Sequence, residues 1–109
     1  MTGPLADIHV SDGDAVTTAH IAAAVTAGGL VYDDGATQVF EPGGATIYVE
    51  RGRPSEGEWY VDGDGRFCSF WPPSYRACYD LHWIVEDGGI VGLRFVERAG
   101  GSEFSGRYR

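Results

Sequence analysis

An aspartate and a histidine lie two residues apart in the stretch Asp80-Leu81-His82. If this stretch is a β-strand, both side chains project from the same face, because successive side chains alternate between faces. A carboxylate beside an imidazole can orient the ring and make it a general base. Asp80 and His82 are therefore the catalytic candidates of the sequence. The alternative interpretation is an exposed strand face that carries mixed charges.

Other patterns of catalysis and metal binding are not found in the sequence. The three histidines share no spacing typical of a metal site, so we predict no metal and no cofactor. No serine lies in a Gly-x-Ser-x-Gly motif. The stretch Asp62-Gly63-Asp64-Gly65 has only the first two ligands of a calcium loop. Its glycines lead into a predicted strand rather than a helix, so they form no phosphate loop.

All three tryptophans lie between residues 59 and 83. An excess of aromatic side chains with few polar groups is typical of a site for a small apolar ligand. A core that is merely rich in tryptophan is the alternative. In the first interpretation Ser69 gives a hydrogen bond and Arg51 holds an acidic group of the ligand. The aromatic candidates for the lining are Trp59, Trp71, Tyr79 and Trp83.

Cys68 and Cys78 are separated by a turn, residues 72–76, that is centred near their midpoint. They should face each other on adjacent strands, with Cβ atoms about 4.5–5.5 Å apart. That separation is close to disulfide geometry. The pair is therefore a disulfide or redox-sensitive pair, or else two buried thiols. The lack of an export signal favours the thiols.

Turn signals divide the chain into elements that would position these residues. Residues 1–13 read as a loose arm and residues 14–28 as an alanine-rich helix, with Asp12 or Asp14 as the N-cap and Gly28 or Gly29 beyond its end. From residue 30 to 109, turn signals recur about every 8–12 residues, which is typical of an antiparallel sheet. The predicted strands are 30–32, 37–41, 45–51, 57–62, 66–71, 77–86, 90–98 and 103–109.

The predicted turns agree on one cross-strand register. It pairs Val61 with Phe67 and Trp59 with Ser69, and it continues through Phe67–Tyr79, Leu81–Phe95, Trp83–Leu93 and Val85–Val91. Such agreement is informative because a slip of one residue inverts a whole strand. The predicted inner face comprises Ile47, Val49, Trp59, Val61, Phe67, Trp71, Tyr79, Leu81, Trp83, Val85, Val91, Leu93 and Phe95.

The fold class that follows is mainly β, in a single domain over residues 1–109. We predict an antiparallel meander that forms a small barrel or half-barrel, lipocalin-like, with one N-terminal helix that plugs one mouth or lies across the open edge. An eight-stranded barrel is just wide enough to be filled by side chains or to hold one small ligand.

The stretch from Gly57-Glu58-Trp59 to Cys68, followed by Cys78-Tyr79, resembles a bacterial family known as domain of unknown function number 995. The resemblance covers roughly residues 40–95 and implies a small, mostly β fold. It brings no established activity. Because many members look exported, it implies a disulfide between the two cysteines. The Gly-x-Trp triplet is also similar to that of lipocalins, where it lies on the first strand, so this is an analogy of fold only.

The chain has 109 residues and a net charge of −8, which argues against nucleic acid or an anionic membrane as a partner. We expect a cytoplasmic protein, or an exported one if the sequence is that of a mature form. The predicted function is binding of a small, partly apolar molecule inside the sheet. The alternatives are a small-barrel enzyme of isomerase or lyase type that uses His82 and Asp80, and a structural or interaction protein. A homodimer would follow if the last strand, 103–109, leaves an unpaired edge.

Overall fold

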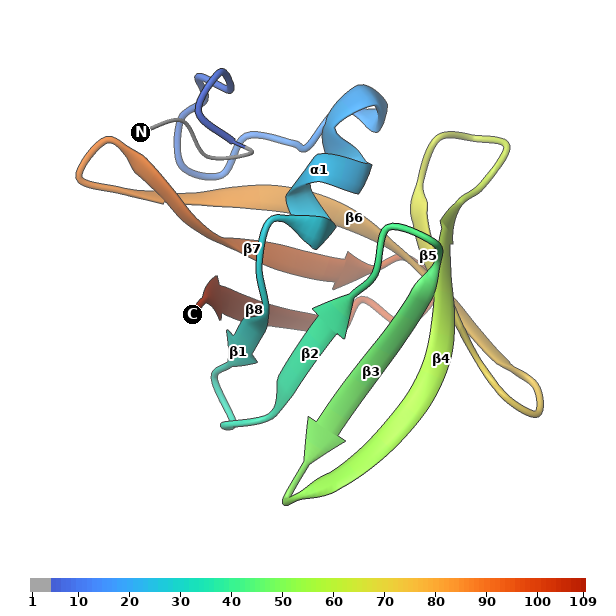
Figure 1. Ribbon diagram of the computed structural model, residues 1–109. Coiled ribbons are helices and arrows are strands. Elements are labelled where there is room, and N and C mark those ends of the chain that lie inside the picture. The colour runs from blue at the N-terminus through green and yellow to red at the C-terminus, as the bar shows by residue number, and fades with distance from the viewer. Residues whose placement is uncertain (1–4) are drawn as a thin grey trace.

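Eight antiparallel strands follow one another along the chain and close into a barrel (Figure 1). The structure is a computed structural model and describes residues 5–109. Each strand pairs with the next one, and the last pairs with the first, so the predicted mainly β fold with one N-terminal helix is confirmed. The strands are β1 (Leu30–Tyr32), β2 (Thr37–Phe40), β3 (Ala45–Glu50), β4 (Arg53–Val61), β5 (Phe67–Trp71), β6 (Tyr75–Glu86), β7 (Gly89–Glu97) and β8 (Glu103–Tyr108).

The predicted register holds over the middle of the sheet. Trp59 pairs with Ser69, and Phe67 pairs with both Val61 and Tyr79. Between β6 and β7 the pairs Leu81–Phe95 and Trp83–Leu93 are also formed as predicted, and Cys68 lies opposite Cys78. Only the end of the β6–β7 hairpin differs. There Val85 pairs with Ile90 rather than Val91, because an irregularity between Ile84 and Val85 shifts the register.

Two hairpins turn through two-residue loops in which both residues have positive φ. These are Arg51-Gly52, with φ of 53° and 77°, and Asp87-Gly88, with φ of 52° and 79°. Such turns match the right-handed twist of the strands they join. The tight turn at Gly52 lets β4 begin at residue 53, so the longer turn predicted over residues 52–56 is wrong. Pro54 is tolerated within β4 because β5 pairs only with residues 58–61 and leaves that part of β4 with one neighbour.

The predicted inner face is wrong on β3. Thr46 is completely buried, whereas Ile47 is 38% exposed, so Ile47 and Val49 face outward. The hydroxyl of Thr46 accepts a hydrogen bond from Gln38 Nε2 at 2.8 Å and donates one to the carbonyl oxygen of Val39 at 2.8 Å. These bonds satisfy a polar side chain inside the barrel. A prediction that places the most hydrophobic residues inward therefore chose the wrong set of alternating residues on this strand.

The predicted helix over residues 14–28 is much shorter in the structure. It consists of a 3-10 turn, Thr18–His20, followed by α1, Ile21–Thr26. The residues before it run beside β6 instead: the backbone N–H of Val16 donates to Leu81 O, and that of Trp83 donates to Asp14 O. β6 is long and β5 is short, so the segment covers a length of β6 that β5 does not reach. Backbone pairing thus overrides the helical propensity of the alanine-rich sequence.

The predicted caps of the helix are also wrong. The carboxylate of Asp12 accepts the backbone N–H of Val85, and that of Asp14 accepts the N–H of Ser11. α1 ends at Thr26, and neither Gly28 nor Gly29 has a positive φ. No helix within residues 5–109 is both long and apolar enough to cross a membrane.

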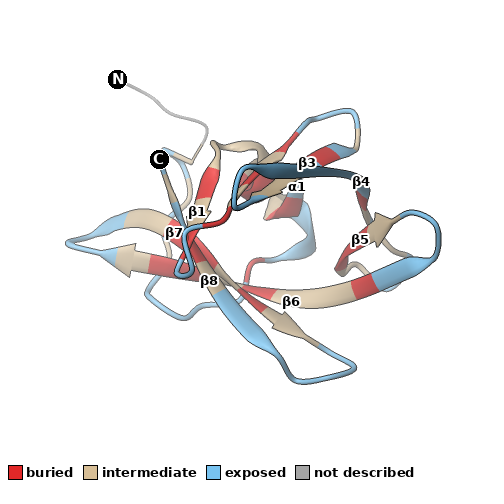
Figure 2. Cartoon of the chain, turned by 90° about the horizontal axis from the view of Figure 1, so that it is seen from below, coloured by how far each residue is buried: buried red, intermediate tan, exposed pale blue. Residues whose placement is uncertain are grey.

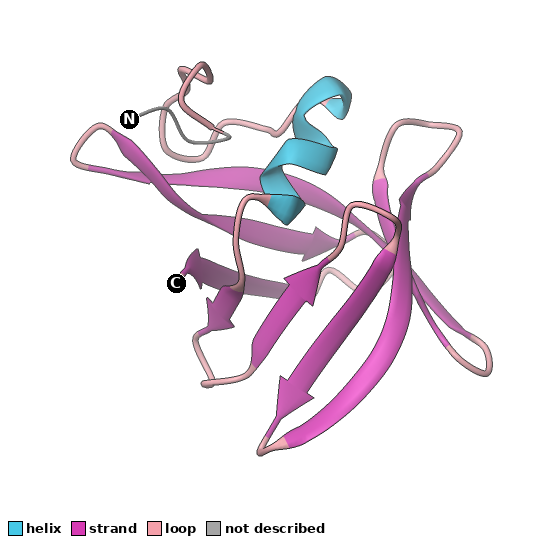
Figure 3. Ribbon diagram, viewed as in Figure 1, coloured by secondary structure: helices cyan, strands magenta, loops and turns pink. Residues whose placement is uncertain are grey.

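α1 lies across one end of the barrel (Figures 1 and 3). This corresponds to the predicted placement at a mouth of the barrel, and not to the placement across an open edge. Ile21, Ala24 and Val25 are buried there and join the core. The hydroxyl of Tyr108 on β8 donates a hydrogen bond to the carbonyl oxygen of Ala24, which ties the helix to the last strand. Figure 2 views the molecule from the other end and shows buried residues within the strands and exposed residues at the turns.

The N-terminal arm is packed rather than loose in the part that the structure describes. Leu5, Ile8 and Val10 are partly buried against the core, without forming a strand. Residues 1–4 of the predicted arm lie outside the described residues.

Strand β8 is paired on both sides. Leu30 to Tyr32 of β1 pair with Tyr108 to Gly106, and β7 pairs with the same strand through Gly92 to Val96. The free edge from which the homodimer was argued is therefore absent at β8. The homodimer itself stays a prediction.

Candidate ligand-binding cavity

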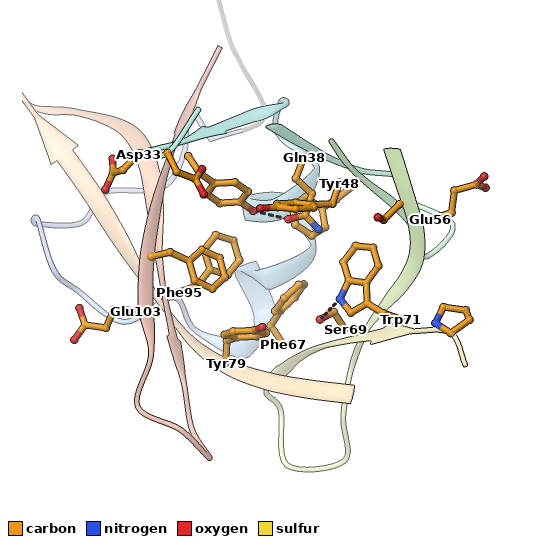
Figure 4. A pocket seen from close by; sticks show the side chains of 16 residues that line it. Asp33, Gln38, Tyr48, Glu56, Phe67, Ser69, Trp71, Tyr79, Phe95 and Glu103 are labelled. Carbon is orange, nitrogen blue, oxygen red and sulfur yellow. Dashed lines mark hydrogen bonds between the residues drawn. The ribbon is translucent and has the colours of Figure 1, made fainter. Parts of the chain in front are cut away.

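The end of the barrel opposite α1 holds a cavity of about 640 Å³ (Figure 4). Its mouth is formed by the β1–β2 turn at Asp33 and Asp34, the start of β4 at Ser55, the β5–β6 turn at Pro72, and the start of β8 at Glu103. Binding sites for small molecules typically have volumes of about 300–1,000 Å³. The cavity is thus large enough for a small ligand, and the helix closes the barrel behind it.

Half of the residues that line the cavity are aromatic. Phe95 on β7 lies at the centre of this wall, with ring centroids 6.0 Å from Tyr32, 5.8 Å from Phe67 and 5.1 Å from Phe104. Edge-to-face and offset contacts of this kind hold rings in defined orientations. The wall is therefore formed before any ligand enters. Its aromatic members are Tyr32, Phe40, Tyr48, Phe67, Trp71, Tyr79, Phe95 and Phe104.

A chain of hydrogen bonds runs through one side of the cavity. The hydroxyl of Tyr32 donates to Gln38 Oε1 at 2.6 Å, and Gln38 Nε2 donates to Thr46 Oγ1 at 2.8 Å. All three side chains are buried. Burial, together with the nearby Tyr48, Tyr79 and Asp34, raises the pKa of Tyr32 far above its usual value, so the phenol keeps its proton. Because that proton is committed to Gln38, the Tyr32 oxygen is available to a ligand only as an acceptor.

Ser69, Trp71 and Tyr79 form the opposite side, and the structure brings these three predicted residues together in the lining. Trp71 Nε1 donates to Ser69 Oγ at 3.2 Å, and Ser69 is only 3% exposed. Burial raises the pKa of Tyr79 to about 12, with smaller contributions from Tyr75 and Glu97. Tyr79 is therefore a neutral hydrogen-bonding group at physiological pH.

Gly57 explains how Trp71 can occupy this position. A Cβ atom added at Gly57 would lie 2.5 Å from the Trp71 ring and 2.7 Å from the backbone oxygen of Phe70. The absent side chain therefore makes the space in which the indole lies against the backbone of β4. This gives a structural role to the glycine of the Gly-x-Trp triplet, although the tryptophan it accommodates is Trp71 rather than Trp59.

Four carboxylates surround the mouth and are called here the acidic rim: Asp33, Asp34, Glu56 and Glu103. The labelled rim residues Glu56 and Glu103 point away from the aromatic wall (Figure 4). Asp34 acts on the interior as well, since it raises the pKa of Tyr48 after the larger effects of burial and Glu50. None of the cavity-lining residues within 5–109 is basic.

Three predicted ligand-binding residues do not line the cavity. Arg51 lies in the exposed β3–β4 turn, so its predicted role in holding an acidic group is not supported by its position. Trp59 and Trp83 belong to the core, at 8% and 1% exposure. Trp59 Nε1 donates to Glu41 O at 2.8 Å, whereas Trp83 Nε1 is buried and has no hydrogen-bond partner among the described residues. For these two tryptophans the alternative of a tryptophan-rich core is correct.

The catalytic candidates lie outside the barrel wall and do not contact each other. Asp80 pairs with Arg98, with its carboxylate oxygens 3.1 and 3.2 Å from Nη1. His82 lies opposite Arg94, and its Nδ1 is 3.1 Å from the carbonyl oxygen of Gly13. Neither side chain lines the cavity. The predicted pairing of a base with its orienting carboxylate is therefore wrong.

Cys68 and Cys78 are joined by a disulfide across β5 and β6. The bond lies on the outer face of the strands whose inner face carries Ser69, Trp71 and Tyr79. Asp62 lies beside it, with Oδ2 3.7 Å from Cys68 Sγ. A hydrogen bond from the backbone N–H of Arg66 is the main cause that lowers the pKa of Asp62 below its usual value. The disulfide thus links the two strands that form one wall of the cavity.

The aromatic cluster predicted between residues 59 and 83 accounts for only part of the wall. Tyr32, Gln38, Tyr48 and Phe104 come from β1, β2, β3 and β8, which lie outside that stretch of the sequence. Tyr48 faces the cavity because Thr46 and Tyr48, and not Ile47 and Val49, are the inward residues of β3. No local signal identifies Gln38, because a single glutamine in a strand usually faces solvent.

No family model, no curated protein and no solved structure matches this chain. The resemblance of residues 40–95 to domain of unknown function number 995 therefore stays a prediction.

Proposed function

We propose that this protein binds a small, partly apolar molecule in the cavity at the open end of its barrel. The observation that carries the proposal is the cavity itself, about 640 Å³ in volume and walled by eight aromatic side chains. An apolar body that leaves water for such a wall gains about 25 cal/mol per Å² of buried surface. The ordered rings add little cost of reorganisation, because they already contact one another.

The polar groups within the wall support binding with a defined orientation. Tyr32, Gln38, Ser69 and Tyr79 contribute hydroxyl and amide groups among the rings. A few polar groups at defined positions in a mainly apolar cavity are the usual source of specificity in small-molecule sites. We propose no reaction, because His82 and Asp80 lie outside the cavity and contact other partners.

The three indole N–H groups provide a test with internal controls. Trp71 lines the cavity, whereas Trp59 and Trp83 are buried in the core. In a two-dimensional ¹H–¹⁵N spectrum, titration with small aromatic and aliphatic alcohols should move the Trp71 indole signal and leave the other two almost unchanged. The Trp71→Phe variant assigns the signal. If no compound moves the Trp71 signal at millimolar concentration, or if all three move equally, the proposal is wrong.

A further inference from the structure

We infer that the cavity prefers a ligand whose apolar body carries a positively charged amine or ammonium group. This inference rests on the proposed function and names the chemical class of the ligand. It reverses the expectation from the sequence, in which Arg51 was to hold an acidic group. The ring system would lie among the aromatic side chains, and the cationic group would lie at the mouth near the β1–β2 turn.

The first support is the distribution of charge around the mouth. The lining includes four acidic residues, the acidic rim, and none that is basic. Within residues 5–109 the rim carboxylates form no ion pair, whereas Asp62, Asp64, Asp80 and Glu86 do. An anion that enters such a mouth meets like charges, and a cation meets carboxylates that form no ion pair among the described residues.

The second support is the position of the basic residues. Arg66, Arg98 and Arg107 pair with carboxylates that do not line the cavity. Arg76 lies over the rings of Tyr60 and Phe70, at 5.9 and 5.4 Å from their centroids, on the outer face of the sheet. None of these guanidinium groups lines the cavity, so no protein cation occupies the aromatic wall in place of a ligand.

The third support is the character of the wall beside Tyr48. Tyr48 and Trp71 lie edge to face, with ring centroids 6.4 Å apart, and both line the cavity. The faces of tryptophan and tyrosine rings attract cations that approach within about 6 Å. The Tyr32 oxygen is an acceptor in the same region, as its proton is held by Gln38. Rings, an accepting oxygen and carboxylates together suit an ammonium group.

Electrostatic effects on the phenols agree with this geometry. After burial, the pKa of Tyr48 is raised by Glu50 and Asp34, and the pKa of Tyr79 is raised by Tyr75 and Glu97. Each of these carboxylates disfavours a negative charge on the phenol oxygen that it acts on. The same potential would favour a positive charge held by a ligand.

Three probes that share one ring and differ in charge test the inference. They are 2-phenylethylamine, which is a cation at pH 7, neutral 2-phenylethanol, and the anion 3-phenylpropanoate. Binding is followed through the Trp71 indole signal at low salt. The amine should bind about tenfold more tightly than the anion, with the alcohol between them, and this preference should shrink as salt screens the rim.

A matched pair of double variants locates the effect. Asp33→Asn with Asp34→Asn removes two charges from the rim, while asparagine keeps a side-chain oxygen where Asp34 Oδ1 accepts the N–H of Ala36. Glu58→Gln with Asp87→Asn removes two charges from exposed positions that do not line the cavity. The rim variant should weaken binding of the amine about three- to fivefold and leave the alcohol unchanged, and the control should change neither.

The outcomes separate the two proposals. If the alcohol or the anion binds as tightly as the amine, or if both double variants weaken the amine equally, the preference for a cation is wrong while binding in the cavity stands. If none of the three probes moves the Trp71 signal in a variant or in the wild-type protein, the proposed function itself is wrong. Unfolding midpoints of both double variants, measured alongside, exclude loss of the fold as the cause.

Discussion

The two ends of the barrel use aromatic side chains in opposite ways. At the end covered by α1, Trp83 is 1% exposed and its indole N–H has no partner among the described residues. At the open end, Trp71 is only half-buried, yet its indole N–H donates to Ser69. At the covered end, apolar packing buries Trp83 although its indole N–H makes no hydrogen bond among the described residues. At the open end, a hydrogen bond to Ser69 orients the Trp71 ring. The difference indicates that the covered end maintains the fold, and it agrees with the proposal that the open end binds a ligand.

Truncation of the two tryptophans should give the largest contrast. Trp83→Ala leaves a void beside Leu93 in the buried core and should lower the free energy of unfolding by about 3–5 kcal/mol. Trp71→Ala borders a cavity that already exists and should cost only about 1 kcal/mol. Urea denaturation of both variants measures the difference. Equal losses would show that the open end belongs to the core as much as the covered end does.

Removal of the disulfide tests how the cavity wall is held. Cys68 and Cys78 close a loop of 10 residues, and the double Cys→Ala variant should lose about 2–3 kcal/mol of stability. The wild-type protein under reducing conditions is the companion measurement. The Trp71 indole signal should shift in both cases, since the bond joins the strands that carry Ser69 and Tyr79, while the Trp83 signal should stay in place. A shift of Trp83 alone would contradict this link to the open end.

Gly57 offers a smaller change confined to the same wall. In Gly57→Ala the added methyl group must displace the Trp71 ring, which lies 2.5 Å from the Cβ position, and about 1–3 kcal/mol of stability should be lost. Gly63→Ala is the matched control, since nothing lies within 4 Å of its Cβ position, and its effect should be below about 0.5 kcal/mol. Thermal melts compare the two, and similar melting temperatures would show that Trp71 moves without cost.

The smallest effect is on the alkaline side of the stability profile. Burial raises the pKa of Tyr79 from its usual 10.0 to about 12, so the folded state holds this proton more tightly than the unfolded state. That contribution to stability is complete below pH 10 and is lost as the pH rises through 12. Tyr79→Phe should therefore lose less stability over this interval than the wild-type protein does. Parallel profiles in urea at each pH would contradict the raised pKa.

The sequence predicted the strands more accurately than the cavity. Alternation and glycine-containing turns place all eight strands and the register from Trp59 to Phe95. They fail where a tertiary contact outweighs the local pattern. Thr46 faces inward because Gln38 and the Val39 carbonyl satisfy it, and residues 13–16 pair with β6 instead of forming a helix.

The candidate site was predicted in part for a related reason. Ser69, Trp71 and Tyr79 lie on neighbouring strands joined by a short turn, so their proximity follows from the sequence pattern. Tyr32 joins them only through barrel closure, in which β1 meets β8 and the Tyr32 ring contacts that of Phe104. Arg51 was predicted to hold an acidic group of the ligand, but it lies in the β3–β4 turn and does not line the cavity, whereas Ser55 and Glu56 further along β4 do.

The segment from Asp12 to Val16 has a consequence for self-association. It supplies backbone partners to Leu81 and Trp83 and a carboxylate to the N–H of Val85, along a stretch of β6 that β5 does not reach. In a chain shortened to begin after Val16, the backbone groups of that stretch of β6 would lack partners and could pair with a strand of another molecule. The segment therefore occupies the free side of this stretch of β6 and prevents a strand of a second copy from pairing there.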